Sequence, residues 1–370
     1  MHKTVHKIPF IDNYKRFEEF NAWLKHNNYN NAITIGRVDY ERRTIAIISD
    51  SENHIYDLDN FMLDFVRLQD TYVIGNIDAL ELYDFTRLYS LTHPEAFQDK
   101  LEEYAKNLNL LGETSFMLWD FNVNITPYGL ELAGYTGSRA RTHLVIPFGI
   151  TSIGNNAFNK CIWLLGIDLP TTIKKIGEFA FANSGLESVN VPDSVEIIEM
   201  GAFNLCTNLK EVKLSANLKF LGEASFAFSA IEEIVIPNTL ETIEYSTFSE
   251  CRKLKSVKLP ENLKAIGVRA FYADIKLESI EIPDTVEAIN AHAFGYCTRL
   301  NTVKSPKHLI TLGSRAFMHT DIEEIELPNS LKMIGDRAFL YCKKLRKANI
   351  PITVEEVGRE IFFGTLLKHE

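Results

Sequence analysis

One pattern of apolar and polar positions recurs ten times along the second part of the chain. An apolar pair, usually followed by Pro, precedes an Ile and then Ala-Phe or a close variant. The phenylalanines follow one another at intervals of 22 or 23 residues, and a period of that length is typical of a solenoid of stacked repeats. They are Phe158, Phe181, Phe203, Phe226, Phe248, Phe271, Phe294, Phe317, Phe339 and Phe362.

The apolar positions before each Pro predict one short parallel strand per repeat. Leu209, Val212 and Leu214 show the spacing L-x-x-L-x-L, in which the last two apolar residues alternate with exposed ones. Pro then ends the strand, because it lacks an amide donor and fixes φ. A Gly often follows the Ile, which indicates either a corner with positive φ or close packing between coils. Stacked repeats would align the ten Phe rings into one internal row.

A known repeat family shares these features. The run Leu132–Gly137, followed by Leu144–Pro147 and Thr151–Phe158, resembles the start of a BspA-type leucine-rich-repeat array. The resemblance covers roughly residues 128–365. It implies a leucine-rich-repeat solenoid of about ten repeats that binds a protein or a surface, without catalysis and without a cofactor.

The five cysteines occupy one position of the repeat, three residues after a Phe, in every second repeat. Equivalent positions two coils apart are separated by about 9–10 Å, which exceeds the Cα separation of about 7 Å that a disulfide allows. We therefore expect buried free thiols and a reducing, cytoplasmic compartment. No metal-ligand spacing occurs among them, so the sequence predicts no metal site. The residues are Cys161, Cys206, Cys251, Cys297 and Cys342.

The charge of the predicted strands follows the same double period. Strands of the Cys-containing repeats are mostly basic, as at Lys255 and Lys258, and those between are acidic, as at Glu232 and Glu233. Neighbouring strands should therefore pair Lys with Glu. A surface of cancelling charge is a poor platform for nucleic acid, so we expect no direct nucleic-acid binding.

Residues 1–127 lack the repeat and are predicted to form an acidic α+β domain, with the array at 128–370. Residues 1–140 contain 13 Lys and Arg against 21 Asp and Glu, within a net charge of −10 for the chain. Apolar spacing predicts helices near 13–27, 78–91 and 94–109, and a hairpin from 33–38 and 44–48. The start has no apolar signal region and the chain has no long apolar run, so we expect no membrane segment.

This first part carries no recognisable catalytic motif. Only three glycines precede residue 129, too few for a phosphate-binding loop, and there is no Cys. The acidic run 57–64 lacks the glycine and the closing glutamate of a calcium loop, and is better explained as a solvated helix face. His54 lies near it, and a surface His explains it better than a metal or acid–base pair.

One column of residues suggests a contact surface. Two positions before the Phe, four consecutive repeats carry Arg or His, and a Tyr follows the Phe in three of these repeats. Stacking would align them into a basic and aromatic strip, a composition typical of binding hot spots. Packing of the Arg stems on neighbouring repeats is the alternative explanation. The candidate protein-binding residues are Arg269, Tyr272, His292, Tyr296, Arg315, Arg337 and Tyr341.

The sequence favours a non-enzymatic protein–protein interaction module whose acidic N-terminal domain sets specificity. Two other hypotheses are an inhibitor that covers a basic site on a nucleic-acid-handling protein of a host or defence system, and an enzyme with an active site in residues 1–127. The partner is expected to be another protein. Self-association through the C-terminal edge is a further expectation, because Phe363–Glu370 is too short for another repeat.

Overall fold

A computed structural model describes the four strands at 33–39, 44–49, 52–57 and 115–118 together with residues 121–137, 139–146 and 149–367. The chain divides into two compact units. The first comprises Met1–Ala140 and Pro147–Ile150, and the second comprises Arg141–Ile146 and Thr151–Glu370.

The first unit contains two antiparallel groups of strands. β1 (Ile33–Asp39), β2 (Thr44–Ser49) and β3 (Glu52–Asp57) form a sheet in that order, with a bulge between Ile35 and Val38. The pairing of β1 with β2 confirms the predicted hairpin. β4 (Ser115–Leu118), β5 (Phe121–Thr126) and β6 (Gly129–Tyr135) follow as a meander, which the sequence analysis did not anticipate. The three predicted helices, the acidic run 57–64 beyond Asp57 and the catalytic hypothesis for this region fall largely outside the described residues.

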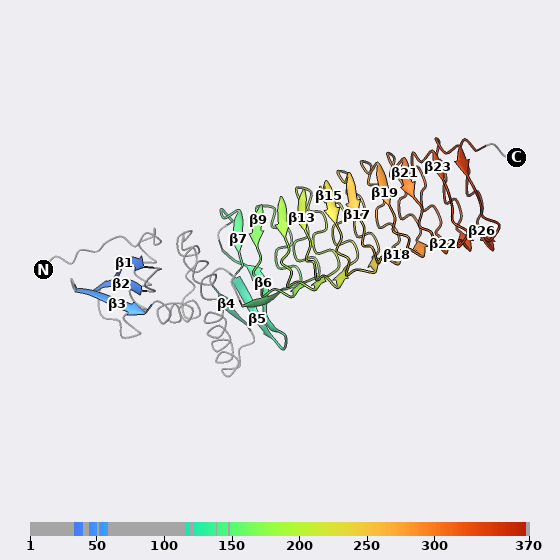
Figure 1. The fold of residues 1–370 in the computed structure, drawn as a ribbon. Helices are drawn as coiled ribbons and strands as arrows, with labels where there is room; N and C mark the ends of the chain where they lie inside the picture. The colour runs from blue at the N-terminus through green and yellow to red at the C-terminus, as the bar shows by residue number, and fades with distance from the viewer. Residues whose placement is uncertain are drawn as a thin grey trace. The chain divides into compact units, whose positions relative to one another are not determined.

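The second unit is a solenoid whose predicted strands lie along one side of the coils (Figure 1). These parallel strands have three residues in most coils and two in each of the last two coils, and they correspond to the L-x-L part of the repeat. They are β7 (His143–Val145), β9 (Gly166–Asp168), β11 (Ser188–Asn190), β13 (Glu211–Lys213), β15 (Glu233–Val235), β17 (Ser256–Lys258), β19 (Ser279–Glu281), β21 (Thr302–Lys304), β23 (Glu324–Ile325) and β25 (Lys347–Ala348).

Each coil also carries a second short strand, which the sequence spacing had not indicated. These strands end at the aliphatic residue that precedes the Gly position, usually Ile, and form parallel ladders on another side of the coils (Figure 1). They are β8 (Ile150–Ile153), β10 (Lys175–Ile176), β12 (Ile197–Ile198), β14 (Phe220–Leu221), β16 (Thr242–Ile243), β18 (Ala265–Ile266), β20 (Ala288–Ile289), β22 (Thr311–Leu312), β24 (Met333–Ile334) and β26 (Glu356–Val357).

The ten repeat phenylalanines form a continuous stack inside the solenoid, which we call the phenylalanine spine. Neighbouring rings lie 5.1 to 5.8 Å apart, and the first eight pairs are within 8° of parallel. The ninth pair, Phe339 and Phe362, is 5.4 Å apart and tilted by 23°. Backbone bonds between coils support the stack, as from Phe181 N to Ala202 O at 2.8 Å. The predicted row of rings is therefore confirmed.

Two left-handed corners bracket each spine residue. In all ten coils the residues two positions before and two positions after the Phe have φ between +50° and +76°. Most of them are not glycines, so the array holds unfavourable backbone conformations at regular intervals. The Gly after the Ile is not at such a corner. A Cβ on Gly222 would lie 2.5 Å from the backbone of Glu199, so close packing between coils explains this position.

The double period seen in the sequence is a structural unit of two coils. The first set of strands pairs only in twos, as β11 with β13 and β15 with β17, and within the described residues β13 and β15 form no ladder. The two coils that contribute β15 and β17 also share a buried contact between Ser229 Oγ and Cys251 Sγ at 3.2 Å. The Cys251 thiol donates to Phe226 O at 3.2 Å.

The five cysteines are free, as expected, and four of them are buried, Cys161 being partly exposed. Burial raises the pKa of the Cys206 and Cys342 thiols to about 11. The neutral thiol is therefore the stable form at neutral pH, which leaves these side chains poor nucleophiles.

Candidate protein-binding surface

Aromatic side chains form a second, external ladder over the last five coils. We call it the ring ladder, and it consists of Tyr272, Tyr296, His319, Tyr341 and Phe363. Tyr296, His319 and Tyr341 occupy the left-handed corner after the spine Phe, while Tyr272 and Phe363 directly follow their spine residue. These five side chains are partly or largely exposed, whereas four of the five spine residues beside them are buried.

The rings contact one another without interruption along the ladder. Tyr272 and Tyr296 lie edge to face at 5.5 Å, and Tyr296 stacks on His319 at 4.7 Å with 14° between the planes. His319 and Tyr341 follow at 5.1 Å, and Tyr341 meets Phe363 edge to face at 5.6 Å. Tyr341 is 39% exposed and Phe363 51%. The coil period thus places five rings in one partly exposed row.

The predicted basic column lies at the other left-handed corner of the same coils. Arg269 Cζ lies 5.4 Å from the centre of the Tyr272 ring, and the His292 ring lies 6.0 Å from that of Tyr272. Arg315 is half-buried one coil beyond His292. Among the described residues, neither Arg269 nor Arg315 has a carboxylate within ion-pair distance. Arg337 differs, because its Nε lies 2.7 Å from Glu360 Oε2.

The local field around the two histidines is positive. Burial, followed by the charges of Arg269 and Arg315, lowers the pKa of His292. Burial and then Lys343 lower the pKa of His319. Both rings are therefore neutral at pH 7. His292 Nδ1 is buried and has no hydrogen-bond partner among the described residues.

The structure brings together most of the residues that the sequence singled out. Arg269, Tyr272 and His292 form one contact group, and Tyr296 and Tyr341 join through His319. The sequence analysis missed His319 and Phe363. Both could have been found by following the positions after the spine Phe through all coils, instead of looking for Tyr alone.

The strand side of the solenoid has a different character. Its charges pair between coils as predicted, with Lys255 Nζ 2.6 Å from Glu232 and Arg346 Nη2 2.6 Å from Glu323. A groove of about 890 Å³ runs over β21, β23 and β25 and is lined by residues of both charges, including Lys304 and Glu326.

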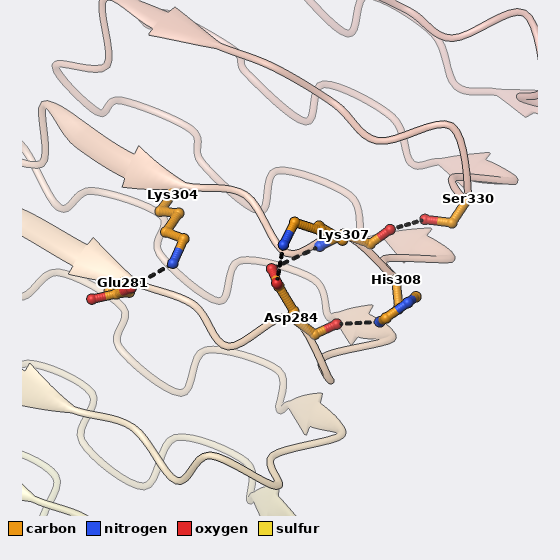
Figure 2. Close-up of polar contacts among 6 residues, drawn as sticks. All are labelled: Glu281, Asp284, Lys304, Lys307, His308 and Ser330. Atoms are coloured by element: carbon orange, nitrogen blue, oxygen red, sulfur yellow. Dashed lines mark hydrogen bonds and ion pairs between the residues drawn. The ribbon is translucent and has the colours of Figure 1, made fainter.

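Polar contacts join neighbouring coils beside this groove, and Lys304 and Lys307 belong both to these contacts and to the groove lining (Figure 2). Lys304 pairs with Glu281 across neighbouring strands, and Lys307 Nζ reaches Asp284 Oδ2 at 2.6 Å. His308 Nδ1 lies 2.8 Å from Asp284 O, and Ser330 Oγ donates to Lys307 O at 2.9 Å. These side chains are already paired with groups of neighbouring coils. The contacts therefore stabilise the stacking of the coils and leave little unpaired charge for a ligand.

The described part of the chain lacks two kinds of feature. Three or more His, Cys, Asp or Glu side chains suited to one metal ion occur nowhere in it. Nor does that part contain a helix of the length and apolarity needed to cross a membrane.

Comparison with known proteins identifies the repeat. The family model for the BspA type leucine rich repeat region matches residues 135–255, 220–281 and 264–369, with six copies of its unit. These ranges together span more than half of the chain. None of the curated proteins compared with the chain matches it.

Solved structures share the repeat fold. A leucine-rich repeat protein from Bacteroides ovatus is 23% identical, with a TM-score of 0.54 over 67% of this chain and 92% of that one. The pneumococcal vaccine antigen PcpA is 24% identical over 69% of each chain, with a TM-score of 0.47. A leucine-rich cell surface protein from Faecalibacterium prausnitzii is 19% identical over 69% of this chain and 94% of that one, with a TM-score of 0.38.

Proposed function

Because the chain belongs to the BspA-type leucine-rich-repeat family, we propose that it is a non-enzymatic scaffold that binds another protein through the ring ladder and the adjacent Arg269, His292 and Arg315. Repeat solenoids present extended surfaces of this kind for binding.

The continuous ring ladder is the observation that carries this proposal. Five partly exposed rings in contact, beside two arginines without a carboxylate partner, match the composition of binding hot spots. The strand side offers no comparable feature, since its Lys and Glu residues pair with each other. Surface ion pairs of that type add little binding energy.

A capture experiment with matched variants tests the proposal. The tagged full-length chain is used to capture partners from a lysate of the source cells. Tyr296→Asn with Tyr341→Asn removes two rings, and Asn is tolerated at these corners because Asn183 occupies the same one. We expect capture to fall at least tenfold, which corresponds to about 1.4 kcal/mol.

The control is Leu205→Asn with Phe228→Asn. These residues occupy the same corner in the first half of the array and are 38% and 45% exposed. Capture by this variant should match that of the wild type, with similar melting temperatures for all three proteins. Equal capture by the ring variant and the control would refute the proposed surface.

The acidic N-terminal portion is proposed to add specificity, a role supported by its excess of eight acidic residues, 21 against 13, over residues 1–140. Deleting residues 1–127 should then change which proteins are captured while leaving capture dependent on the ring ladder. The inhibitor and enzyme hypotheses concern this same portion and gain no support from its described residues.

We further propose that the protein works in a reducing, cytoplasmic compartment, which the five free thiols support. Self-contact at the last coil is a related proposal, supported by the exposure of Ile352, Val357 and Leu366. Sedimentation should show a mass that rises with concentration, and Ile352→Lys with Val357→Lys should abolish that rise. A wild-type mass independent of concentration would refute the self-contact.

A further inference from the structure

We infer that the surface formed by the ring ladder, Arg269 and Arg315 takes an acidic segment in the polyproline II conformation from a partner protein. The inference rests on the proposed function, since it names the chemistry of the partner at the same surface.

The arginines supply the charge. Arg269 and Arg315 lie on either side of His292, and two carboxylates of other coils in this part of the array are already engaged. Glu250 Oε2 lies 2.7 Å from Arg252 Nη2, and Glu360 pairs with Arg337. A guanidinium without a carboxylate on the protein keeps its planar set of N–H donors available, and carboxylate is its best-matched acceptor.

The spacing of the arginines selects the conformation of the segment. They are two coils apart, and the spine rings of those coils are separated by 5.4 and 5.3 Å, so equivalent positions lie about 10–11 Å apart. In a polyproline II helix, residues three apart lie on one side and about 9.3 Å apart. In a β-strand, residues three apart point to opposite faces. Carboxylates at every third residue of a polyproline II segment therefore fit this spacing.

The rings favour a peptide over a single-stranded nucleic acid. Tyr296, His319 and Tyr341 each have a ring neighbour on both sides, so a base could stack between them only by separating existing contacts. Base stacking on proteins needs open ring faces. The rings of the ladder remain partly exposed, and the edges of aromatic rings are electropositive. Aromatic rows of this type are the usual partners of proline-rich segments.

The test is fluorescence anisotropy with the full-length protein and a fluorescein-labelled peptide of four Glu-Pro-Pro units. We expect binding that weakens as salt is raised. A peptide of four Gln-Pro-Pro units and a scrambled peptide with clustered Glu should each bind at least tenfold more weakly. A fluorescein-labelled dT12 should bind no better than the Gln peptide.

Two sets of variants connect the binding to the surface. The variant Arg269→Asn with Arg315→Asn removes both positive charges. Asn is suited to this left-handed corner, because Asn156 occupies the equivalent corner in the first coil. This variant and Tyr296→Asn with Tyr341→Asn should each lose at least tenfold in affinity for the Glu peptide. Leu205→Asn with Phe228→Asn should bind like the wild type, and thermal melting verifies that each variant is folded.

The outcomes separate this inference from the proposed function. The inference of an acidic segment would be overturned by any of three results. These are equal binding of the Glu and Gln peptides, no detectable binding of the Glu peptide, or unchanged affinity of the Arg variant. Partner capture that still depends on Tyr296 and Tyr341 would leave the proposed function standing in that case. Binding of dT12 that the same variants abolish would identify a nucleic-acid surface and overturn both. Salt-independent affinity of the wild type would also contradict the inference, even if the Arg variant failed to fold.

Discussion

Asp274 is a buried carboxyl group three residues after the spine Phe, where the other repeats without Cys carry Ser or Thr. Its side chain is 0% exposed, and neither oxygen has a hydrogen-bond partner among the described residues. At the equivalent position, Ser184 and Thr320 contact the next Cys at 3.3 and 3.2 Å. We predict that Asp274→Ser stabilises the array by about 1–3 kcal/mol at pH 4, the usual cost of an unpaired buried polar group, and by more at pH 7.

The pH dependence has a definite sign. Burial is the main cause that raises the pKa of Asp274 well above 3.8, and the charge of Glu250 adds to the rise. The thiols of Cys251 and Cys297 beside it are neutral, because burial also raises their pKa values. The unfolded state therefore loses its proton at lower pH than the folded state. The contribution of Asp274 to stability is therefore most favourable below about pH 4 and falls by about 1.4 kcal/mol per pH unit until the folded pKa of Asp274 is reached.

Urea unfolding from pH 4 to pH 8 measures both effects. Asp274→Ser should raise the midpoint and remove the downward slope that Asp274 contributes. The reverse change, Ser229→Asp, places a carboxyl group at the same position two coils earlier and should introduce a comparable loss of stability. A wild-type chain more stable than Asp274→Ser at pH 7, or identical pH slopes for the two proteins, would refute this reasoning.

Three other predictions concern the array. Phe248→Ala should cost about 3–5 kcal/mol in urea unfolding, because it interrupts the phenylalanine spine; a loss below 1 kcal/mol would contradict the continuous stack. A thiol reagent should modify Cys161 first and the other four cysteines only in denaturant, whereas rapid modification of all five would contradict their burial. Ala224→Gly should stabilise by about 1 kcal/mol in thermal melting, because it relieves a left-handed corner at φ +50°; destabilisation would show that the corner carries no strain.

The period of the sequence was sufficient to predict the core of the solenoid. An apolar residue that recurs at the same place in every coil must stack on itself, so the spine, the first strands and the Lys–Glu pairs follow from spacing alone. The second strand was harder to foresee. A two-residue strand such as Thr242–Ile243 contains only one apolar–polar alternation, and the next coil supplies its hydrogen bonds.

Backbone conformation was the least predictable feature of the site. Arg269, Phe228 and Ala224 all occupy left-handed corners, although none has a preference for that conformation. Stacking between coils imposes it, so the residue types give no signal. The ring ladder was missed for a different reason, because a search for Tyr alone passes over His319, which occupies the same repeat position as Tyr296 and Tyr341. For the Gly after the Ile, the sequence left two explanations open, a corner with positive φ or close packing between coils. The close approach of the Glu199 backbone to Gly222 favours the second.

Site-specific photo-crosslinking tests the central claim, that the ring ladder is the surface that meets another protein. p-Benzoylphenylalanine is placed at Tyr296 in the ladder, at Phe228 on the same corner of an earlier coil, or at Val235 on β15, which is 62% exposed. After irradiation in source-cell lysate, the account predicts a crosslinked protein from position 296 that is absent from positions 228 and 235. Crosslinking from position 235 with none from position 296 would place the contact on the strand side and contradict the account.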